Sequence, residues 1–188
     1  MSLSQTYCQP AVTSSRKTIV SAVLQIIGAS LFIALCAQIR IPLFFTPVPI
    51  TCQTLAVMLI GALLGSKKGA LAVLLYLAEA AVGLPVLAEG NFGIANLIGV
   101  RAGYLVGFVA QSYLIGKFFE SQKSISGIKT LFVLLASSVV QMGLGVLWLA
   151  HFVGLQNVML MGFYPFIPGE VIKAFAVTLY LKSRMNNR

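Results

Sequence analysis

The stretch Pro165-Phe166-Ile167-Pro168-Gly169-Glu170-Val171-Ile172-Lys173-Ala174 places a carboxylate and an ammonium inside an otherwise apolar segment. Residues three apart on a helix lie on one face, so Glu170 and Lys173 are expected to point in the same direction. On a helix surrounded by water, such a pair would have little significance. In a helix that spans a bilayer, each charge costs about 2.5–3.5 kcal/mol on insertion scales and indicates a functional site. The solvent around this segment therefore decides its meaning.

The composition indicates a membrane protein. Of the 188 residues, 59% are hydrophobic and 9% are charged, whereas soluble proteins carry roughly 25% charged residues. The formal net charge is +9, but nucleic-acid binding would need basic residues gathered on one face, and here they stand between apolar blocks. We therefore predict a single integral membrane domain that lies in the lipid bilayer and binds no nucleic acid.

Six apolar blocks are close to the roughly 20 residues that a membrane-spanning helix requires. They predict an all-α bundle of six transmembrane helices at residues 18–39, 51–65, 69–88, 102–119, 130–150 and 164–181. The domain is predicted at residues 18–182, between a polar N-terminal tail of residues 1–17 and a basic C-terminal tail of residues 183–188. Small residues at four-residue spacing are typical of close packing between membrane helices. They include Gly61 and Gly65, and Gly99, Gly103 and Gly107.

The distribution of basic residues predicts the orientation in the membrane. If both termini are cytoplasmic, ten of the 13 basic residues lie on the cytoplasmic side. These are Arg16, Lys17, Lys67, Lys68, Lys117, Lys123, Lys129, Lys182, Arg184 and Arg188. Among the three exceptions, Arg40 is predicted to be an interfacial residue whose charge reaches the headgroups. Arg101 and Lys173 call for another explanation.

The four acidic residues are all glutamates, and three have an ordinary explanation. Glu120 lies among the cytoplasmic lysines, where solubility explains it. Glu89 opens a glycine-containing outer loop, where exposure to solvent explains it. Glu79 lies within the third apolar block, and both a structural hydrogen bond and a role in a site remain open for it. Glu170 has no comparable explanation.

Glu170 and Lys173 are predicted to lie at membrane depth. With a rise of 1.5 Å per residue, they lie roughly 16 and 12 Å from the cytoplasmic end of the last apolar block, within a hydrocarbon core about 30 Å thick. Pro165 and Pro168 would interrupt the helix there, and irregular backbone is tolerated at this depth where it lines a wet cavity. We therefore predict a cavity that opens outward, beneath the loop of residues 84–100. The alternative is an ion pair that only staples the bundle.

No pattern of catalytic or metal-binding residues is visible. The run Gly61–Lys67 lacks the spacing of a phosphate-binding loop. His151 is the single histidine, so a transition-metal cluster and a nucleophile with a histidine base both lack their partners. The three cysteines, Cys8, Cys36 and Cys52, are predicted to be unpaired. We therefore predict that the protein is not an enzyme and carries no cofactor and no metal.

Five motifs, in this order, resemble the BioY family, the biotin-binding S components of energy-coupling factor transporters. They are Thr46–Val57, Gly83–Val86, Gly99–Tyr104, Gly145–Leu149 and Pro165–Lys173. The resemblance covers nearly the whole chain from about residue 18. It implies a six-helix protein of the bacterial cytoplasmic membrane that captures biotin on the outer side and delivers it inward by reorienting in the bilayer. The partners that it implies are a transmembrane coupling subunit and two ATPase subunits.

The resemblance also implies which residues bind biotin. An acid and a lysine on the last helix of the family correspond to Glu170 and Lys173, and an arginine corresponds to Arg101. The family's asparagine corresponds to Asn91 or Asn96, and we choose Asn91. The chain departs from the family in two places, because the usual aspartate is the longer glutamate here and the usual Gly-Pro-Thr run reads Gly-Val-Arg.

The chemistry of these residues suits biotin, which has a ureido ring, an apolar thioether ring and tail, and one carboxylate. Glu170 would accept hydrogen bonds from the ureido N–H groups, and Lys173 would donate one to the ureido carbonyl. Trp148 and Tyr104 are predicted either to pack on the bicyclic ring or to anchor the chain at the membrane interface. Gln53 is predicted to add a polar contact.

On the first helix, Ser30 and Ala34 match the small residues that S components commonly present to the coupling subunit. We therefore predict a partner contact at these two residues. Two other hypotheses stay open. The chain could be a secondary transporter or channel for another small organic anion, or an intramembrane enzyme or assembly scaffold. A homo-oligomer is possible under each of them.

Overall fold

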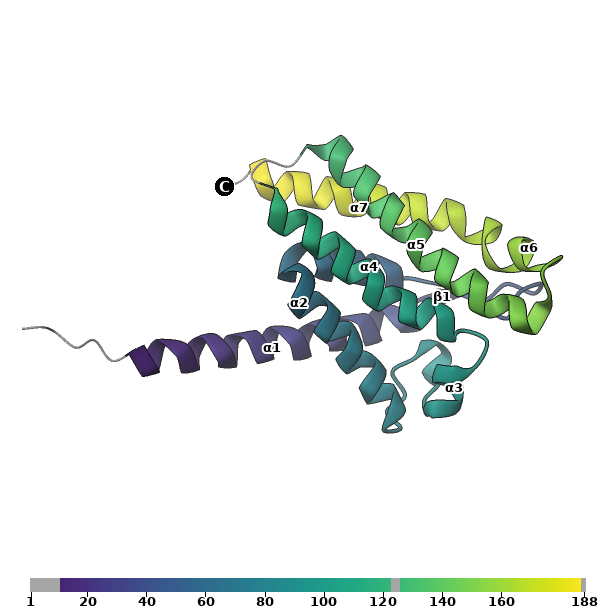
Figure 1. Ribbon diagram of the computed structural model, residues 1–188, viewed down its shortest axis with the longest axis horizontal. Helices are drawn as coiled ribbons and strands as arrows, with labels where there is room; N and C mark the ends of the chain where they lie inside the picture. Colours follow the sequence, from purple (N-terminus) through teal and green to yellow (C-terminus); the bar gives the residue numbers. More distant parts are fainter. Residues whose placement is uncertain (1–10, 123–125, 187–188) are drawn as a thin grey trace, which may run out of the picture.

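The computed structural model describes residues 11–122 and 126–186, which form a bundle of long helices with shorter elements at one end (Figure 1). The elements in chain order are α1 (Ala11–Gln38), β1 (Arg40–Ile41), β2 (Ile50–Thr51), α2 (Gln53–Ala81), the 3-10 helix η1 (Ala88–Gly90), α3 (Ile94–Ile98), α4 (Ala102–Ser121), α5 (Gly127–Val153), α6 (Val158–Gly162), the 3-10 helix η2 (Tyr164–Phe166) and α7 (Ile167–Asn186). The predicted tail residues 1–10 and 187–188, with Cys8, Lys123 and Arg188, lie outside the described residues.

Six long helical segments confirm the predicted all-α fold, because α2 consists of two segments. Gly65, in the middle of α2, has φ 82° and ψ 179°, and glycine adopts a positive φ without the steric penalty of a side chain. The chain turns there and separates the second predicted helix from the third. Gly65 is therefore a turn residue rather than a helix-packing residue, and a Cβ at this position would also meet the carboxylate of Glu120.

The observed helices differ from the predicted ones mainly at their ends. Helix α1 begins at Ala11 rather than at residue 18, and α2 ends at Ala81 rather than at residue 88. Pro165 lies in η2, and Pro168 lies in the first turn of α7, which begins at Ile167. A proline in the first turn removes an N–H group that has no partner within the helix anyway. Pro165 thus lies in the break between α6 and α7, within the apolar span Val158–Arg184, which agrees with the predicted interruption. Pro168 begins α7 and does not interrupt a helix.

Within the described chain, four helices are long and apolar enough to span a membrane: Thr18–Gln38, Gln53–Ala81, Gly127–Val153 and Val158–Arg184. The protein is therefore a multi-pass membrane protein.

Helix α4 packs between α2 and α5, and glycines allow the helices to approach closely there. A Cβ on Gly107 of α4 would lie 2.8 Å from the carbonyl oxygen of Gln141 on α5. A Cβ on Gly61 of α2 would lie 2.7 Å from the carbonyl oxygen of Ser112 on α4. These two contacts confirm the predicted packing at small residues.

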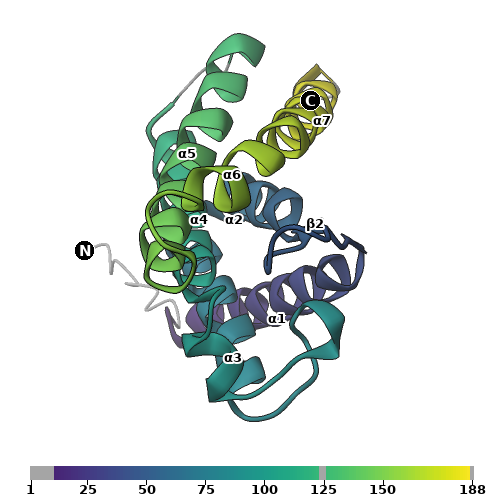
Figure 2. The same cartoon turned by 90° about the vertical axis from the view of Figure 1, so that its right-hand side faces the viewer.

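The two ends of the bundle carry different elements. The amino end of α1 and the carboxyl end of α7 lie at the left of Figure 1, while α3 and α6 lie at the right. Strands β1 and β2 pair antiparallel, with Arg40 opposite Thr51, and this hairpin lies between α1 and α7 in the end-on view of Figure 2. The segment of residues 82–101, which contains η1 and α3, lies at the right-hand end of the bundle in Figure 1. The longer loops therefore gather at the end opposite the start of α1 and the end of α7.

Candidate functional site

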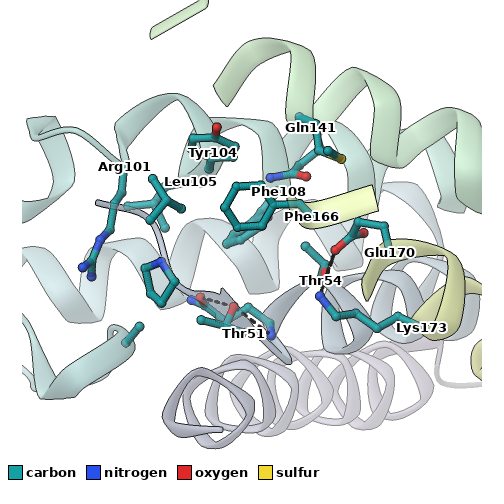
Figure 3. Close-up of a pocket in the computed structure, with 15 residues that line it drawn as sticks. Thr51, Thr54, Arg101, Tyr104, Leu105, Phe108, Gln141, Phe166, Glu170 and Lys173 are labelled. Carbon is teal, nitrogen blue, oxygen red and sulfur yellow. Dashed lines mark hydrogen bonds and ion pairs between the residues drawn. The ribbon is translucent and has the colours of Figure 1, made fainter. Parts of the chain in front are cut away.

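Glu170 lies in the first turn of α7 and is 5% exposed. The positive end of the helix dipole favours a carboxylate in this turn. Its Oε1 accepts hydrogen bonds from Thr54 Oγ1 at 2.6 Å and from Lys173 Nζ at 2.8 Å. Lys173 also donates to Thr54 Oγ1 at 2.7 Å. Figure 3 shows the three side chains directed toward one another, so the ion pair of α7 is bound to α2 through a threonine.

The second carboxylate oxygen of Glu170 is bound to α5. Its Oε2 accepts a hydrogen bond from Ser138 Oγ at 3.0 Å. A carboxylate has about four acceptor positions, and Thr54, Lys173 and Ser138 fill three of them. Among the described residues, the position that remains is on Oε2. The carboxylate is thus held in place and still has room for one more donor.

Glu170 and Lys173 line a cavity of about 530 Å³, counted with the space at its open mouth. In Figure 3, Arg101 lies at the opposite end of the cavity from the ion pair, and Phe108 and Phe166 lie between them. The cavity therefore has an ion pair at one end, a cation at the other and aromatic rings in the middle.

The structure brings five of the seven predicted binding residues to this cavity: Gln53, Arg101, Tyr104, Glu170 and Lys173. The side chains of Gln53 and Tyr104 are fixed by hydrogen bonds within the chain. Gln53 Nε2 donates to the Tyr76 hydroxyl at 2.6 Å, and the Tyr104 hydroxyl donates to the carbonyl oxygen of Gly162 at 2.7 Å. Both side chains present preformed walls to a ligand.

Asn91 and Asn96 line a smaller cavity, which shares Arg101 with the main one. Asn91 Nδ2 donates to the carbonyl oxygen of Ala88 at 3.0 Å and to Glu89 Oε2 at 3.3 Å. The two asparagines thus lie beside the end of the main cavity where Arg101 is. A contact between Asn91 and a ligand stays a prediction.

Trp148 is outside the set of described residues that line the cavity. Its indole Nε1 donates to the carbonyl oxygen of Gly99 at 2.9 Å, and 41% of the residue is exposed. Whether Trp148 packs on a ligand ring or anchors the chain at the membrane interface stays a prediction. Its hydrogen bond supports the turn that precedes α4.

Ser30 is turned into the chain. It is 0% exposed, and its hydroxyl donates to Glu79 Oε1 at 2.8 Å. Ala34, one turn further along α1, is half-buried and packs on the same core. The predicted contact of Ser30 and Ala34 with a coupling subunit stays a prediction. The same hydrogen bond assigns Glu79 a structural role, one of the two left open for it.

Two arginines and a glutamate connect the loops around the cavity. Glu89 forms ion pairs with Arg40 at 2.7 Å and with Arg101 at 3.4 Å. Arg101 Nε also donates to the carbonyl oxygen of Pro47 at 3.3 Å. The side chains of Arg40 and Glu89 are 37% and 33% exposed, which is consistent with the predicted exposure of Glu89 to solvent. The interfacial position of Arg40 stays a prediction. Arg101 joins the loop before β2 to the loop that contains η1.

Three neutral polar residues were missed by the sequence analysis: Thr54 and Gln141, which line the cavity, and Ser138, which is hydrogen-bonded to Glu170. Thr54 lies in a motif that carries the family resemblance, but it was given no role. Ser138 and Gln141 are three residues apart on α5, inside an apolar block. The argument that selected Glu170 and Lys173, two polar groups on one face of a membrane helix, would have selected this second pair as well.

Comparisons with known proteins identify the family of the chain. The family model described as the BioY family matches residues 9–187. The chain is 37% identical over 165 residues to the biotin transporter BioY of Rhizobium etli, and the matched region covers 84% of this chain and 88% of that protein. It is 38% identical over 172 residues to the biotin transporter BioY of Rhodobacter capsulatus, covering 82% of this chain and 87% of that protein.

A solved structure is similar over almost the whole chain. It is the crystal structure of the S-component for biotin from an ECF-type ABC transporter, with a TM-score of 0.82 and 31% sequence identity. The match covers 92% of this chain and 94% of that chain.

Proposed function

The chain belongs to the BioY family, and from this premise we propose that it is the biotin-binding S component of an energy-coupling factor transporter. It captures biotin at the outer face of a bacterial cytoplasmic membrane. A transmembrane coupling subunit and two ATPase subunits then drive its delivery inward. The family is one of transport components, so the chain is not an enzyme.

The ion pair of Glu170 and Lys173 is the observation that carries this proposal. Glu170 Oε2 has one acceptor position left, and Lys173 uses two of its three N–H groups on Thr54 and Glu170. A ureido group supplies the N–H donor and the carbonyl acceptor that these two positions require. Hydrogen bonds to charged groups contribute about 1.5–3 kcal/mol each. The end of the cavity formed by α7 therefore suits the ureido ring.

The other end of the cavity suits the carboxylate of biotin. Glu170, Lys173 and Arg101 carry formal charges of −1, +1 and +1, so the cavity has a surplus of one positive charge, and biotin carries one negative charge. Arg101 lies opposite the ion pair (Figure 3), and Asn91 lies in the adjoining smaller cavity. Phe108 and the other apolar residues between the two ends can contact the thioether ring and the tail.

The position of the cavity supports capture from outside. Its lining includes Val48 and Ala88. Both belong to the loops at one end of the bundle, and the start of α1 and the end of α7 lie at the other end. The distribution of basic residues predicts cytoplasmic termini. The cavity then opens toward the outer face.

Equilibrium binding to the purified chain in detergent tests the proposal. Biotin is compared with lipoate, which has a sulfur ring and a carboxylate tail but no ureido group. We expect saturable binding of biotin at one site, at least about 100-fold tighter than that of lipoate, because the ureido group makes two hydrogen bonds to charged side chains. Equal affinities for the two ligands would contradict the proposal. Transport of another anion by the chain alone in liposomes would favour a secondary transporter or channel instead.

A further inference from the structure

A buried row of hydrogen bonds extends from Glu170 away from the cavity, from α7 through α5 to α4. Ser138 Oγ lies 3.0 Å from Glu170 Oε2, and Gln111 Nε2 lies 3.0 Å from Ser138 Oγ. Ser138 is 2% exposed and Gln111 is 0% exposed. The described lining of the cavity includes neither residue. Glu170 is the cavity-lining side chain to which this row is hydrogen-bonded.

The row has a direction. The Ser138 hydroxyl has one proton and two acceptors within reach, Glu170 Oε2 at 3.0 Å and the carbonyl oxygen of Leu134 at 3.1 Å. Gln111 donates to the Ser138 oxygen, which leaves the hydroxyl to act as the donor for its next partner. A carboxylate is a stronger acceptor than a carbonyl, and hydrogen bonds in a row strengthen one another. Ser138 therefore donates to Glu170.

The bond from Ser138 affects the oxygen that is available to a ligand. Glu170 Oε1 is occupied by Thr54 and Lys173, so within the described chain the free acceptor position is on Oε2. With donors on both oxygens, the carboxylate cannot rotate without breaking a buried hydrogen bond. Its remaining acceptor position is thus fixed before a ligand arrives. Such preorganisation increases affinity because less side-chain freedom is lost on binding.

We propose that Ser138 and Gln111 are positioning residues that orient Glu170 toward a ureido N–H group of the ligand. The inference rests on the proposed function, because it takes biotin as the ligand. A glutamate side chain has three rotatable bonds, and the hydrogen bond to α5 reduces their freedom.

Substitutions in the full chain test the inference. Ser138→Ala removes the donor to Oε2, and Gln111→Met keeps the length of the side chain but removes its amide. Ser137→Ala is the matched control, because Ser137 is also buried on α5 but donates to the carbonyl oxygen of Leu134. We expect Ser138→Ala to weaken biotin binding about tenfold and Gln111→Met about threefold, while Ser137→Ala changes it less than about twofold.

A double-mutant cycle separates positioning from a general loss of structure. In a Glu170→Gln background, Ser138→Ala should change biotin affinity by less than about twofold, because the charged acceptor is already gone. Ser138→Ala alone also leaves the buried Gln111 amide without its acceptor. The double variant Ser138→Ala/Gln111→Met removes both groups, and it tests the inference even if the single variant does not fold.

Each outcome has a distinct meaning. An unchanged biotin affinity in Ser138→Ala and in Ser138→Ala/Gln111→Met would overturn the positioning role. The role would also be overturned if Ser138→Ala weakened biotin binding equally in the wild-type chain and in the Glu170→Gln background. If the wild-type chain does not bind biotin, the proposed function fails, and the positioning role for this ligand fails with it. Binding of biotin by the wild-type chain with no effect of the variants overturns the positioning role alone.

Discussion

Replacing Lys173 with methionine distinguishes a binding site from a structural ion pair. The side chains of Lys173 and Glu170 are 12% and 7% exposed. Removal of one partner from a buried ion pair costs roughly 3–5 kcal/mol, because the other charge is left unpaired. Glu170 would keep its hydrogen bonds from Thr54 and Ser138, so we expect the lower end of this range. Lys173→Met should therefore reduce the free energy of unfolding by about 3 kcal/mol.

The same substitution should weaken biotin binding by a separate mechanism. Lys173 would no longer donate to the ureido carbonyl, and such a hydrogen bond contributes about 1.5–3 kcal/mol, or roughly a 10- to 150-fold change in affinity. The double variant Lys173→Met/Glu170→Gln leaves no unpaired charge in the interior. We expect it to regain most of the lost stability and to remain defective in biotin binding.

Thermal unfolding in detergent and isothermal titration with biotin measure the two effects. Lys182→Met is the control, since Lys182 lies on the same helix and is exposed; it should change neither quantity. If the pair only staples the bundle, biotin affinity will recover together with stability in the double variant. That recovery, or wild-type affinity in Lys173→Met, would refute the assignment of the pair to the ligand.

Three further predictions concern residues outside this pair. Arg101→Gln should weaken biotin binding roughly tenfold but change the binding of biotin methyl ester by less than about twofold, since the ester has no charge for Arg101 to bind. Titration with both ligands checks this, and an equal loss of affinity for the two ligands would contradict it. Trp148→Phe should change biotin affinity less than about twofold in the same titration, because the indole donates its hydrogen bond to the backbone; a larger loss would indicate that Trp148 packs on the ligand. Hydrogen bonds from Ser66 lower the pKa of Glu120 from its usual 4.5. The ionised carboxylate therefore stabilises the folded state fully above pH 4.5, and this contribution is lost as the pH falls through the lower pKa of the folded state. Thermal scans should show that Glu120→Gln is less stable than the wild type at pH 7 and that the difference disappears in acid; a difference that persists in acid would contradict this.

The helices and the two central charges were predictable from the sequence because the bilayer imposes strong constraints. Spanning a hydrocarbon core needs a minimum length of apolar sequence, which yields the six segments. A charge in such a segment is unfavourable enough that Glu170 and Lys173 stood out without further information. Gly65 was noticed for its spacing only, because a positive φ cannot be recognised from the spacing of small residues.

The partners of these charges were not predictable in the same way. Thr54 and Ser138 are 116 and 32 residues from Glu170 in the sequence, so only the packing of the helices brings them together. The burial of Ser30 against Glu79 was not predictable either, for a related reason. Lipid and protein interior are both apolar, so the pattern of apolar residues on a membrane helix does not show which face meets the rest of the chain.

The groups that stabilise the ion pair also determine what a ligand must supply. An isolated buried pair would be unfavourable, since desolvation of two charges can exceed their attraction. The donors on Glu170 offset part of this penalty, and Thr54 serves both charges, as an acceptor for Lys173 and a donor to Glu170. Within the part of the chain that the structure describes, one acceptor position on Glu170 Oε2 and one N–H group on Lys173 remain without a partner. A ligand that offers only acceptors would leave the carboxylate position unfilled, and one that offers only donors would leave the ammonium unfilled. A ureido group satisfies both at once, so the selectivity of the site follows from the same hydrogen bonds that make the buried pair tolerable.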